Sequence, residues 1–402
     1  MPMHHQLVTE VVDPGPWKLS RKVDNTFYAM IVIGAILWGI GFSMNPLRGW
    51  SAYLINFLFV MFLALSGTFF TSLEYITGTK WSPAIRRIPE GISTALPLSL
   101  IFILVLALGV PKLFTWYSTW TNAEGLTRAV ARTKVTWLSQ PFFTIRDFFF
   151  IVLWIILGTL LVKNSRKQDG GNAIHLSKIN NKLSIAFILI YALSFSIASY
   201  DLLMSLEPNW YSTMFGVYTF IGMFESGIAL IAIIAIKMKQ SGTLPLTSKG
   251  HIRDLGALMF AMAVFMSYIG FCQFLLIWYA NLPDETFYFN KRIDNGWWII
   301  FVLFAILKFI IPFVFLMSQA AKRNERRLIV VAVMILLGQW FDLYWMVIPT
   351  KYSELTFPGI ADIGGLLFFV GLFGIPVVRT YRKYSVLPTG DPKILTSLNW
   401  NG

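Results

Sequence analysis

Ten apolar segments run along the chain, each 17 to 26 residues long and separated from the next by a polar link. They lie at 27–44, 53–76, 94–110, 142–162, 183–206, 214–236, 255–280, 297–319, 328–349 and 360–378. A bilayer core about 30 Å thick is crossed by ~20 apolar residues in a helix. Most links contain Pro, Gly, Asn or clustered charges, which end helices outside lipid. The pattern predicts an all-α polytopic membrane protein with about ten transmembrane helices.

These segments form one predicted membrane domain, residues 27–382, between an N-terminal segment, 1–26, and a C-terminal tail, 383–402. Ten crossings place both ends on one side of the membrane. Of the 33 Lys and Arg residues, 23 lie on that side and eight on the other, while Arg146 and Lys308 fall within spans. Because Lys and Arg concentrate in cytoplasmic links, we expect both termini in the cytoplasm. The same bias accounts for the net charge of +13 without a nucleic-acid partner.

Composition agrees with lipid as the main surrounding of the chain. Fifty-six per cent of the residues are apolar, 13% are charged and the mean hydropathy is +0.63, whereas soluble domains are about a quarter charged. The single Cys272 excludes a disulfide framework, an iron–sulfur cluster and a c-type heme attachment motif. None of the four histidines lies inside a predicted span, where a b-type cytochrome holds its heme. We therefore expect no intrinsic cofactor and no metal site.

Two links on the predicted outer side are rich in aromatic and charged residues. The extracytoplasmic loop 111–141 contains Trp116, Tyr117, Trp120 and Trp137, and the link 281–296 also carries several charges. These compositions are typical of an interfacial helix lying among the headgroups, or of a docking surface for an extracytoplasmic partner. We expect three aromatic pairs to be interfacial anchors rather than parts of a quinone site: Trp210-Tyr211, Trp278-Tyr279 and Trp297-Trp298.

Two short similar sequences indicate an internal repeat. The fifth span ends in YDLLM at 200–204, the ninth ends in FDLYWM at 341–346, and each span follows a basic link. We infer two related four-helix units, spans two to five and spans six to nine, flanked by spans one and ten. Repeats of this kind are common in membrane folds.

Ionisable residues inside membrane spans are costly, so each is a functional candidate. Glu225 and Lys308 matter most, because each lies about a dozen residues into its span. At ~3 kcal/mol for each central charge, the two are expected to pair or to share a water-filled cavity. The pair then has either a packing role or a role in passing protons between carboxylates near the outer face and a His/Glu group near the cytoplasm.

The candidate proton path includes residues at three depths: Glu74, Asp147, Asp201, Glu225, His251, Asp254, Lys308 and Asp342. Asp147 can also form a local pair with its neighbour Arg146. Asp362 stands at the start of the tenth span, and there we expect simple N-capping.

Four motifs resemble a known family. They are SFSIASYDLLMSLEPNWYSTMFGVYTFIG at 194–222, HIRDLG at 251–256, FCQFLLIWYANLPDET at 271–286 and QWFDLYWMVIP at 339–349. In this order they resemble the F subunit of bacterial alternative complex III, a quinol:cytochrome c oxidoreductase. That subunit is distantly similar to NrfD-type anchors of polysulfide reductases.

The resemblance implies a place in the bacterial cytoplasmic membrane and a set of partner subunits. The partners would be a sister NrfD-like subunit, an iron–sulfur subunit, multiheme and monoheme cytochromes c and small membrane subunits. Quinone, heme c and iron–sulfur clusters would then belong to the complex, with the redox centres in other subunits. By position, the polar path would use Asp201, Glu225, His251, Asp254, Lys308 and Asp342.

Three functions remain open from the sequence. The first is a non-catalytic scaffolding or proton-conducting subunit of a quinol-oxidising respiratory complex. The second is direct quinone binding, with Asp147 or Asp201 accepting a proton near the outer face. The third is a standalone secondary transporter, although such proteins usually have helices broken near the midplane and this chain has no pair of centrally Gly/Pro-interrupted spans.

Overall fold

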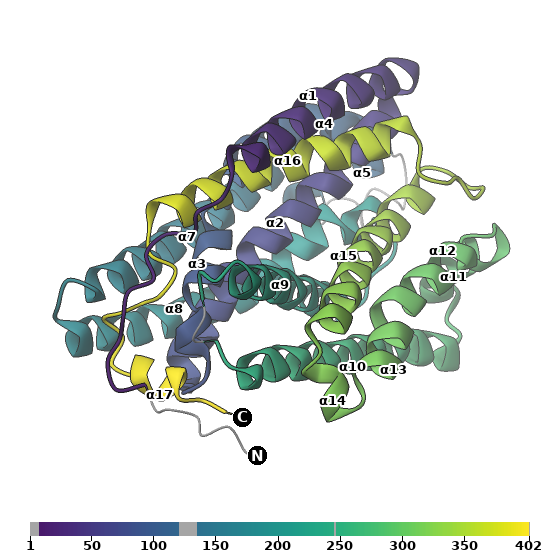
Figure 1. Ribbon diagram of the computed structural model, residues 1–402. Helices are drawn as coiled ribbons and strands as arrows, with labels where there is room; N and C mark the ends of the chain where they lie inside the picture. Colours follow the sequence, from purple (N-terminus) through teal and green to yellow (C-terminus); the bar gives the residue numbers. More distant parts are fainter. Residues whose placement is uncertain (1–7, 120–134, 245–246, 402) are drawn as a thin grey trace.

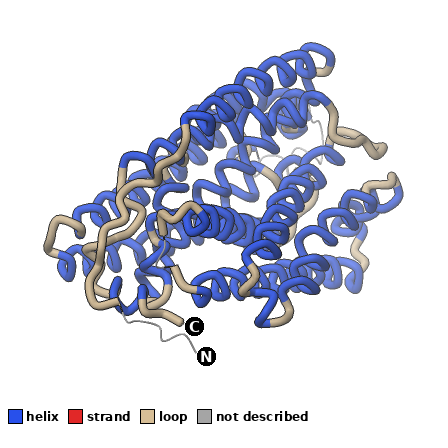
Figure 2. The backbone as a smooth tube through the Cα atoms, viewed as in Figure 1, coloured by secondary structure: helices blue, strands red, loops and turns tan. Residues whose placement is uncertain are grey.

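The computed structural model describes residues 8–119, 135–244 and 247–401, and these are helices and loops without a strand (Figure 2). Ten helical segments in this part of the chain are long and apolar enough to cross a membrane. They are α1 (Arg21–Met44), α2 (Pro46–Thr77), α3 with α4 (Arg87–Leu113), α7 (Gln140–Gln168), α8 with η2 (Ala173–Leu206), α9 (Phe215–Gln240), α10 (Lys249–Ala280), α12 to α13 (Trp298–Leu316), α15 with η4 (Glu325–Thr350) and α16 (Ile360–Lys383). The protein is therefore an all-α multi-pass membrane protein, as the hydropathy pattern predicts.

Four short elements of the described chain lie between these spans, η1 (Ser82–Ile85), α5 (Thr115–Thr119), α11 (Pro283–Asp294) and α14 (Gln319–Lys322), and α17 (Ile394–Leu398) lies in the C-terminal tail. The first and last described residues of the chain lie together (Figure 1), where the Val8 amide donates to the Asn399 side chain and the Trp17 amide to the Tyr381 carbonyl. We call this side of the molecule the terminal face and the other side the opposite face.

Helix α2 is the centre of the protein. Its most apolar stretch is completely buried, and it packs against α1, α4, α8, α9, α15 and α16. A helix that is apolar around its whole circumference needs such an environment. The hydroxyl side chains in the buried part of α2, such as Ser66, Thr68 and Ser72, therefore face other helices rather than lipid.

The packing agrees with two four-helix units. In the first, α2 packs on α4 and α8, and α7 packs on the same two helices. In the second, α9 packs on α10 and α15, while the eighth span packs on these two in turn. Helices α1 and α16 run side by side along one edge (Figure 1) and cover α2. This matches the predicted arrangement of spans two to five and six to nine, flanked by one and ten.

Glycines allow α1 and α16 to approach each other closely. A Cβ at Gly34 would lie 2.4 Å from the Phe368 backbone nitrogen, and one at Gly364 would lie 2.4 Å from the Trp38 nitrogen. Small residues at such crossings bring helix backbones into direct contact, which stabilises helix pairs in lipid. The two flanking spans thus form a tight pair of their own.

Two spans are less regular than the apolar pattern indicates. The third is divided into α3 (Arg87–Ser93) and α4 (Leu98–Leu113), with Pro97 at the start of α4. The eighth contains one π-helical turn, η3 (Ile306–Ile310), between α12 (Trp298–Ala305) and α13 (Ile311–Leu316). Single π-turns are rare and frequent at functional sites. Only the second irregularity lies in the middle of a span, and it contains Lys308.

The loop 111–141 is described only in part, since residues 120–134, with Trp120, lie outside the described residues. Trp116 is 2% exposed and packs against Phe114 and Phe143, so this ring belongs to the core rather than to an interfacial belt. Trp137 is half-exposed, and its indole N–H donates to Asp201. The described part of the loop therefore contributes to packing and to a polar cluster.

The aromatic pairs divide between interior and surface. Trp278, Tyr279, Tyr211 and Trp298 are exposed, as expected for anchors, whereas Trp210 and Trp297 are buried. Trp210 stacks on Tyr288 with ring centroids 3.8 Å apart, and the Trp297 indole donates to the Ser353 carbonyl. The prediction that all three pairs are surface anchors is wrong for these two rings, because adjacent aromatic residues at a helix end point in different directions.

Candidate functional site

A charged cluster lies inside the second unit. The Lys308 ammonium donates to Asp342 Oδ2 at 2.7 Å and to Gln339 Oε1 at 2.7 Å. The Tyr218 hydroxyl donates to the other oxygen of Asp342 at 2.8 Å. Lys308 and Asp342 are 2% and 0% exposed, so the pair is shielded from lipid and solvent. We call Lys308, Asp342 and Glu225 the Lys308 cluster.

Glu225 completes this cluster without joining its hydrogen bonds. One carboxylate oxygen lies 3.8 Å from the Lys308 nitrogen, within ion-pair distance, yet neither oxygen has a hydrogen-bond partner among the described residues. The side chain is 0% exposed. The sequence predicts that Glu225 and Lys308 pair or share a cavity; the structure brings them together, but gives the hydrogen bonds of Lys308 to Asp342 and Gln339.

Local sequence makes room for these side chains. A Cβ at Gly338 would lie 2.5 Å from Lys308 Cγ, so only glycine leaves space for the lysine stem as it crosses α15. At Gly222, a Cβ would lie 2.7 Å from Gln339 Oε1. The π-turn at 306–310 alters the helical register at Lys308 itself. Three local features thus position one ammonium group.

A second cluster lies in the first unit. Arg146 of α7 donates from Nε to Asp201 Oδ2 at 2.8 Å, and its guanidinium lies 4.0 Å from the centre of the Trp137 ring. Asp147 is 1% exposed and interacts electrostatically with both Arg146 and Asp201. Neither of its oxygens has a hydrogen-bond partner in the described chain. We call Arg146, Asp147 and Asp201 the Arg146 cluster. Asp147 does not form the hydrogen-bonded local pair with Arg146.

The two clusters are related through the repeat. In each unit a basic residue of the third helix binds the aspartate of the similar motif at the end of the fourth: Arg146 binds Asp201, and Lys308 binds Asp342. Each cluster also has a second carboxylate that is buried and unbonded, Asp147 or Glu225. These second carboxylates come from different helices of the repeat, so the units share the ion pair but not its companion.

The other candidate residues lie near the terminal face. Glu74 accepts from Arg86 Nε at 2.8 Å, and Arg86 also binds Asp391 in the C-terminal tail. His251 caps α10 through its Nδ1, which lies 3.1 Å from the Ser248 amide. Asp254 accepts from the Trp400 indole at 2.7 Å. Asp254 thus holds the C-terminal segment, and the contacts of His251 with Ser248 and Ser397 also lie at this end of α10, near the terminal face.

Asp362 and Arg48 form an ion pair near the opposite face. Asp362 Oδ2 accepts from the amide of Gly359 at 2.8 Å and also binds Arg48 at 2.7 Å. Gly359 is the N-cap residue of α16, so Asp362 caps the helix from its third position rather than as the N-cap that the sequence predicts. Arg48 belongs to α2 and contacts the Tyr344 hydroxyl of α15. These contacts join three spans, and sequence reasoning missed them because the hydropathy pattern places Arg48 in a link, whereas α2 already begins at Pro46.

Several buried polar oxygens between α2, α7 and α8 also have no hydrogen-bond partner in the described chain. They are Thr68 Oγ1, Ser72 Oγ, Glu74 Oε2, Ser184 Oγ and Tyr191 OH. All five side chains are at most 4% exposed. Buried polar groups in proteins are nearly always bonded, often to ordered water. In the first unit, buried polar groups are therefore distributed between the Arg146 cluster and Glu74.

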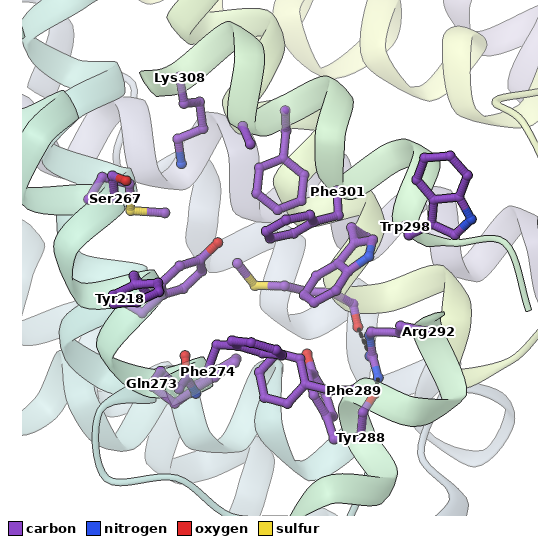
Figure 3. Close-up of a pocket in the computed structure, with 18 of the residues that line it drawn as sticks. Tyr218, Ser267, Gln273, Phe274, Tyr288, Phe289, Arg292, Trp298, Phe301 and Lys308 are labelled. Atoms are coloured by element: carbon purple, nitrogen blue, oxygen red, sulfur yellow. Dashed lines mark hydrogen bonds between the residues drawn. The ribbon is translucent and has the colours of Figure 1, made fainter. Parts of the chain in front are cut away.

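An aromatic cavity of about 400 Å³ lies beside the Lys308 cluster. Figure 3 shows Lys308 and Tyr218 reaching it from one side and Arg292 from the other, with phenylalanine rings between them. Most of the wall is aromatic, from residues such as Trp210, Phe215, Phe274, Tyr288, Phe289, Phe301, Phe304 and Trp345. Asp147 and Asp201 do not line it. The sequence pattern does not predict this cavity, because its wall comes from five separate helices, and it assigns the lining residues Trp210 and Trp298 to interfacial anchors.

Two donors in the cavity wall are unused. Arg292 donates to the Tyr288 carbonyl at 2.8 Å, but its Nε, like the Trp345 indole nitrogen, has no partner among the described residues. Both side chains are buried. Burial lowers the pKa of Arg292, with Tyr288 and Glu207 acting in the opposite direction. An apolar cavity with a few convergent polar groups is the usual form of a small-molecule site.

Comparison with known proteins adds no family assignment. No protein-family model matches the chain, and no curated protein matches it. Among the described residues, no three His, Cys, Asp or Glu side chains are grouped so that they could hold a metal ion.

Proposed function

We propose that this chain is an integral membrane subunit of a bacterial quinol:cytochrome c, or quinol:other acceptor, oxidoreductase complex. Its role there is that of a scaffold and a proton-conducting subunit, while the redox chemistry takes place in partner subunits. The partners would be a sister NrfD-like subunit, an iron–sulfur subunit, c-type cytochromes and small membrane subunits. The four motifs that resemble the F subunit of alternative complex III support this assignment.

The proposed orientation follows from charge. The terminal face carries 23 of the 33 Lys and Arg residues and is assigned to the cytoplasm of a bacterial inner membrane. The Arg146 cluster then lies toward the outer face, the Lys308 cluster near the middle of the membrane, and Glu74 with Arg86 near the cytoplasm. The polar groups span both halves of the membrane.

The observation that carries the proton role is the imbalance of charge in each cluster. Each contains two carboxyl groups and one basic group, so full ionisation leaves one unbalanced negative charge in a buried site. Uptake of one proton makes the cluster neutral, and charge is costly at this depth. Glu225 and Asp147 are the proposed carriers of the exchangeable proton, because their oxygens are not committed to hydrogen bonds.

The proposed route to the cytoplasm runs through the first unit. Its unbonded hydroxyls, including Tyr191, Thr68 and Ser72, lead from the Arg146 side to Glu74. Water between such groups would complete a chain for proton transfer. Glu225 would exchange its proton with this route across the contact between α9 and α2, because the second unit itself has buried apolar residues such as Met259 and Ile335 toward the terminal face.

Affinity purification tests the assignment to a complex. A tagged chain extracted in mild detergent should carry heme c and iron–sulfur subunits in fixed ratio and show quinol oxidation. Recovery of the chain alone, from membranes where the tagged protein is folded, would overturn the assignment and favour a standalone transporter.

A second function, direct quinone binding, is favoured by the aromatic cavity. Its size, its rings and its unused Arg292 and Trp345 donors suit a flat molecule with carbonyl acceptors. The site would lie beside Lys308 rather than beside Asp201. Ser267→Trp fills the cavity, whereas Val264→Trp adds the same ring on the exposed side of α10. Quinone extracted from the purified protein should fall only in the first variant; equal quinone content in both would exclude this site.

A further inference from the structure

A second hollow, of about 480 Å³, opens near the terminal face between the third span and α7. Pro97, Ile155 and Val162 provide apolar surface, and Thr68 lies within it. Lys163, Arg166 and Lys167 line it as well, at the end of α7. The hollow thus combines an apolar surface with a basic rim at the level expected for lipid headgroups.

The three basic residues share one side of α7. Their spacing of i, i+3 and i+4 places them on the same side of the helix. None of them has a carboxylate within 4.0 Å among the residues that the structure describes. The nearby acids Glu90 and Asp169 pair with Arg87 instead. Positive charge at a helix C-terminus is favourable. Three cations without a carboxylate partner around one hollow are also suited to bind an anion.

Arg166 is held in place within the rim. Its guanidinium lies 3.7 Å from the centre of the Tyr384 ring, and its Nε is buried without a hydrogen-bond partner in the described chain. Stacking on an aromatic ring leaves the edge of a guanidinium free to donate to oxygen atoms. The geometry suits a phosphate group between Arg166 and the two lysines.

The hollow is open to the bilayer. Pro97 and Thr159 are exposed, and the neighbouring Ile101 and Ile156 are 58% and 49% exposed on the lipid-facing sides of α4 and α7. A ligand with an acyl chain can therefore enter from the membrane. Basic pockets between spans on the inner side of membranes bind anionic headgroups.

We propose that this hollow binds one anionic phospholipid. Lys163, Arg166 and Lys167 hold its phosphate, and one acyl chain lies along Ile155 and Val162 between the third span and α7. The lipid would fill the space between the third span and α7 and would link α7 to Tyr384 of the C-terminal tail.

Native mass spectrometry of the delipidated protein, titrated with phosphatidylglycerol, tests the proposal. The test variant is Lys163→Gln/Lys167→Gln, and the matched control is Lys178→Gln/Lys182→Gln, which removes two exposed lysines at the same spacing from α8. We expect at least tenfold weaker binding of the first lipid in the test variant and unchanged binding in the control.

Further arms identify the ligand. Phosphatidylcholine and glycerol phosphate should each fail to compete with phosphatidylglycerol, because the site needs both net charge and an acyl chain. Equal lipid binding by the two double variants would overturn the proposal, as would competition by glycerol phosphate at equal concentration. Helix content measured by circular dichroism checks that each variant is folded, and Arg166→Gln, which removes the central cation alone, gives an independent variant with the same expected loss.

Discussion

Lys308 donates a 2.7 Å hydrogen bond to Asp342 from within a π-helical turn, joining the eighth span to the ninth. The corresponding pair in the first unit, Arg146 and Asp201, joins the fourth span to the fifth. Ion pairs buried at this depth are costly to form and more costly to break. They therefore tie each unit together and also create the sites in which an extra carboxyl group can exchange a proton.

Removing Lys308 from its buried pair with Asp342 should destabilise the protein strongly. Lys308→Met leaves Asp342 buried without its cation, which costs about 3–5 kcal/mol. The double variant Lys308→Met/Asp342→Leu should recover most of that loss, since the uncompensated charge is gone. Lys239→Met, at a partly exposed pair with Glu325, should cost no more than ~1 kcal/mol.

Unfolding in mixed micelles with increasing denaturant gives these differences. A single variant Lys308→Met that is as stable as Lys239→Met would show that the buried pair contributes nothing to holding the eighth and ninth spans together.

The contact between α1 and α16 should depend on glycine at one position of α1 and not at another. Gly34→Val places side-chain atoms against the Phe368 backbone and should destabilise the protein by about 1–3 kcal/mol. Gly39→Val is the matched control, because a Cβ there meets nothing within 4 Å. Thermal melting followed by light scattering compares the two, and equal melting temperatures would contradict the close backbone crossing.

Lys351 should give the protein a pH dependence in the alkaline range. This residue follows the ninth span; burial lowers its pKa to about 8, as does the neighbouring Lys291, while Glu207 acts in the opposite direction. The unfolded chain, with a lysine pKa of 10.5, binds the proton more tightly. Stability should therefore rise as the pH increases from about 8 to 10.5.

Lys351→Met should remove this rise while leaving the rest of the pH profile unchanged. Melting temperatures of the two proteins across the alkaline range measure the effect. A rise of the same size in Lys351→Met would assign it to other groups.

The membrane architecture was predictable because it follows from one physical cost. Backbone and side-chain polarity are so unfavourable in lipid that each span, from α1 to α16, appears as an apolar run. The same cost singled out Glu225 and Lys308, and the structure brings them within 3.8 Å. The aspartates of the short repeat, Asp201 and Asp342, occupy related ion pairs.

Other features depend on three-dimensional contacts that a linear pattern does not contain. Counting residues placed Asp342 nearer the outer face than Lys308, but the long lysine side chain and the π-turn bring the two into contact. Trp210 looks like an interfacial anchor in sequence but is buried by Tyr288 of a distant link. His251 lies at the helix entrance where the sequence places it, but its capping contact with Ser248 could not be read from the sequence alone.

The proton-to-electron ratio of the purified complex in vesicles tests the central claim most directly. It is measured for the native protein, for Glu225→Gln, and for Glu325→Gln, which makes the same chemical change at the partly exposed pair with Lys239. The account predicts a lower ratio in Glu225→Gln, with the complex assembled and quinol oxidation retained, and a native ratio in Glu325→Gln. A native ratio in both variants would contradict it, and Glu225 would then have only a packing role beside Lys308.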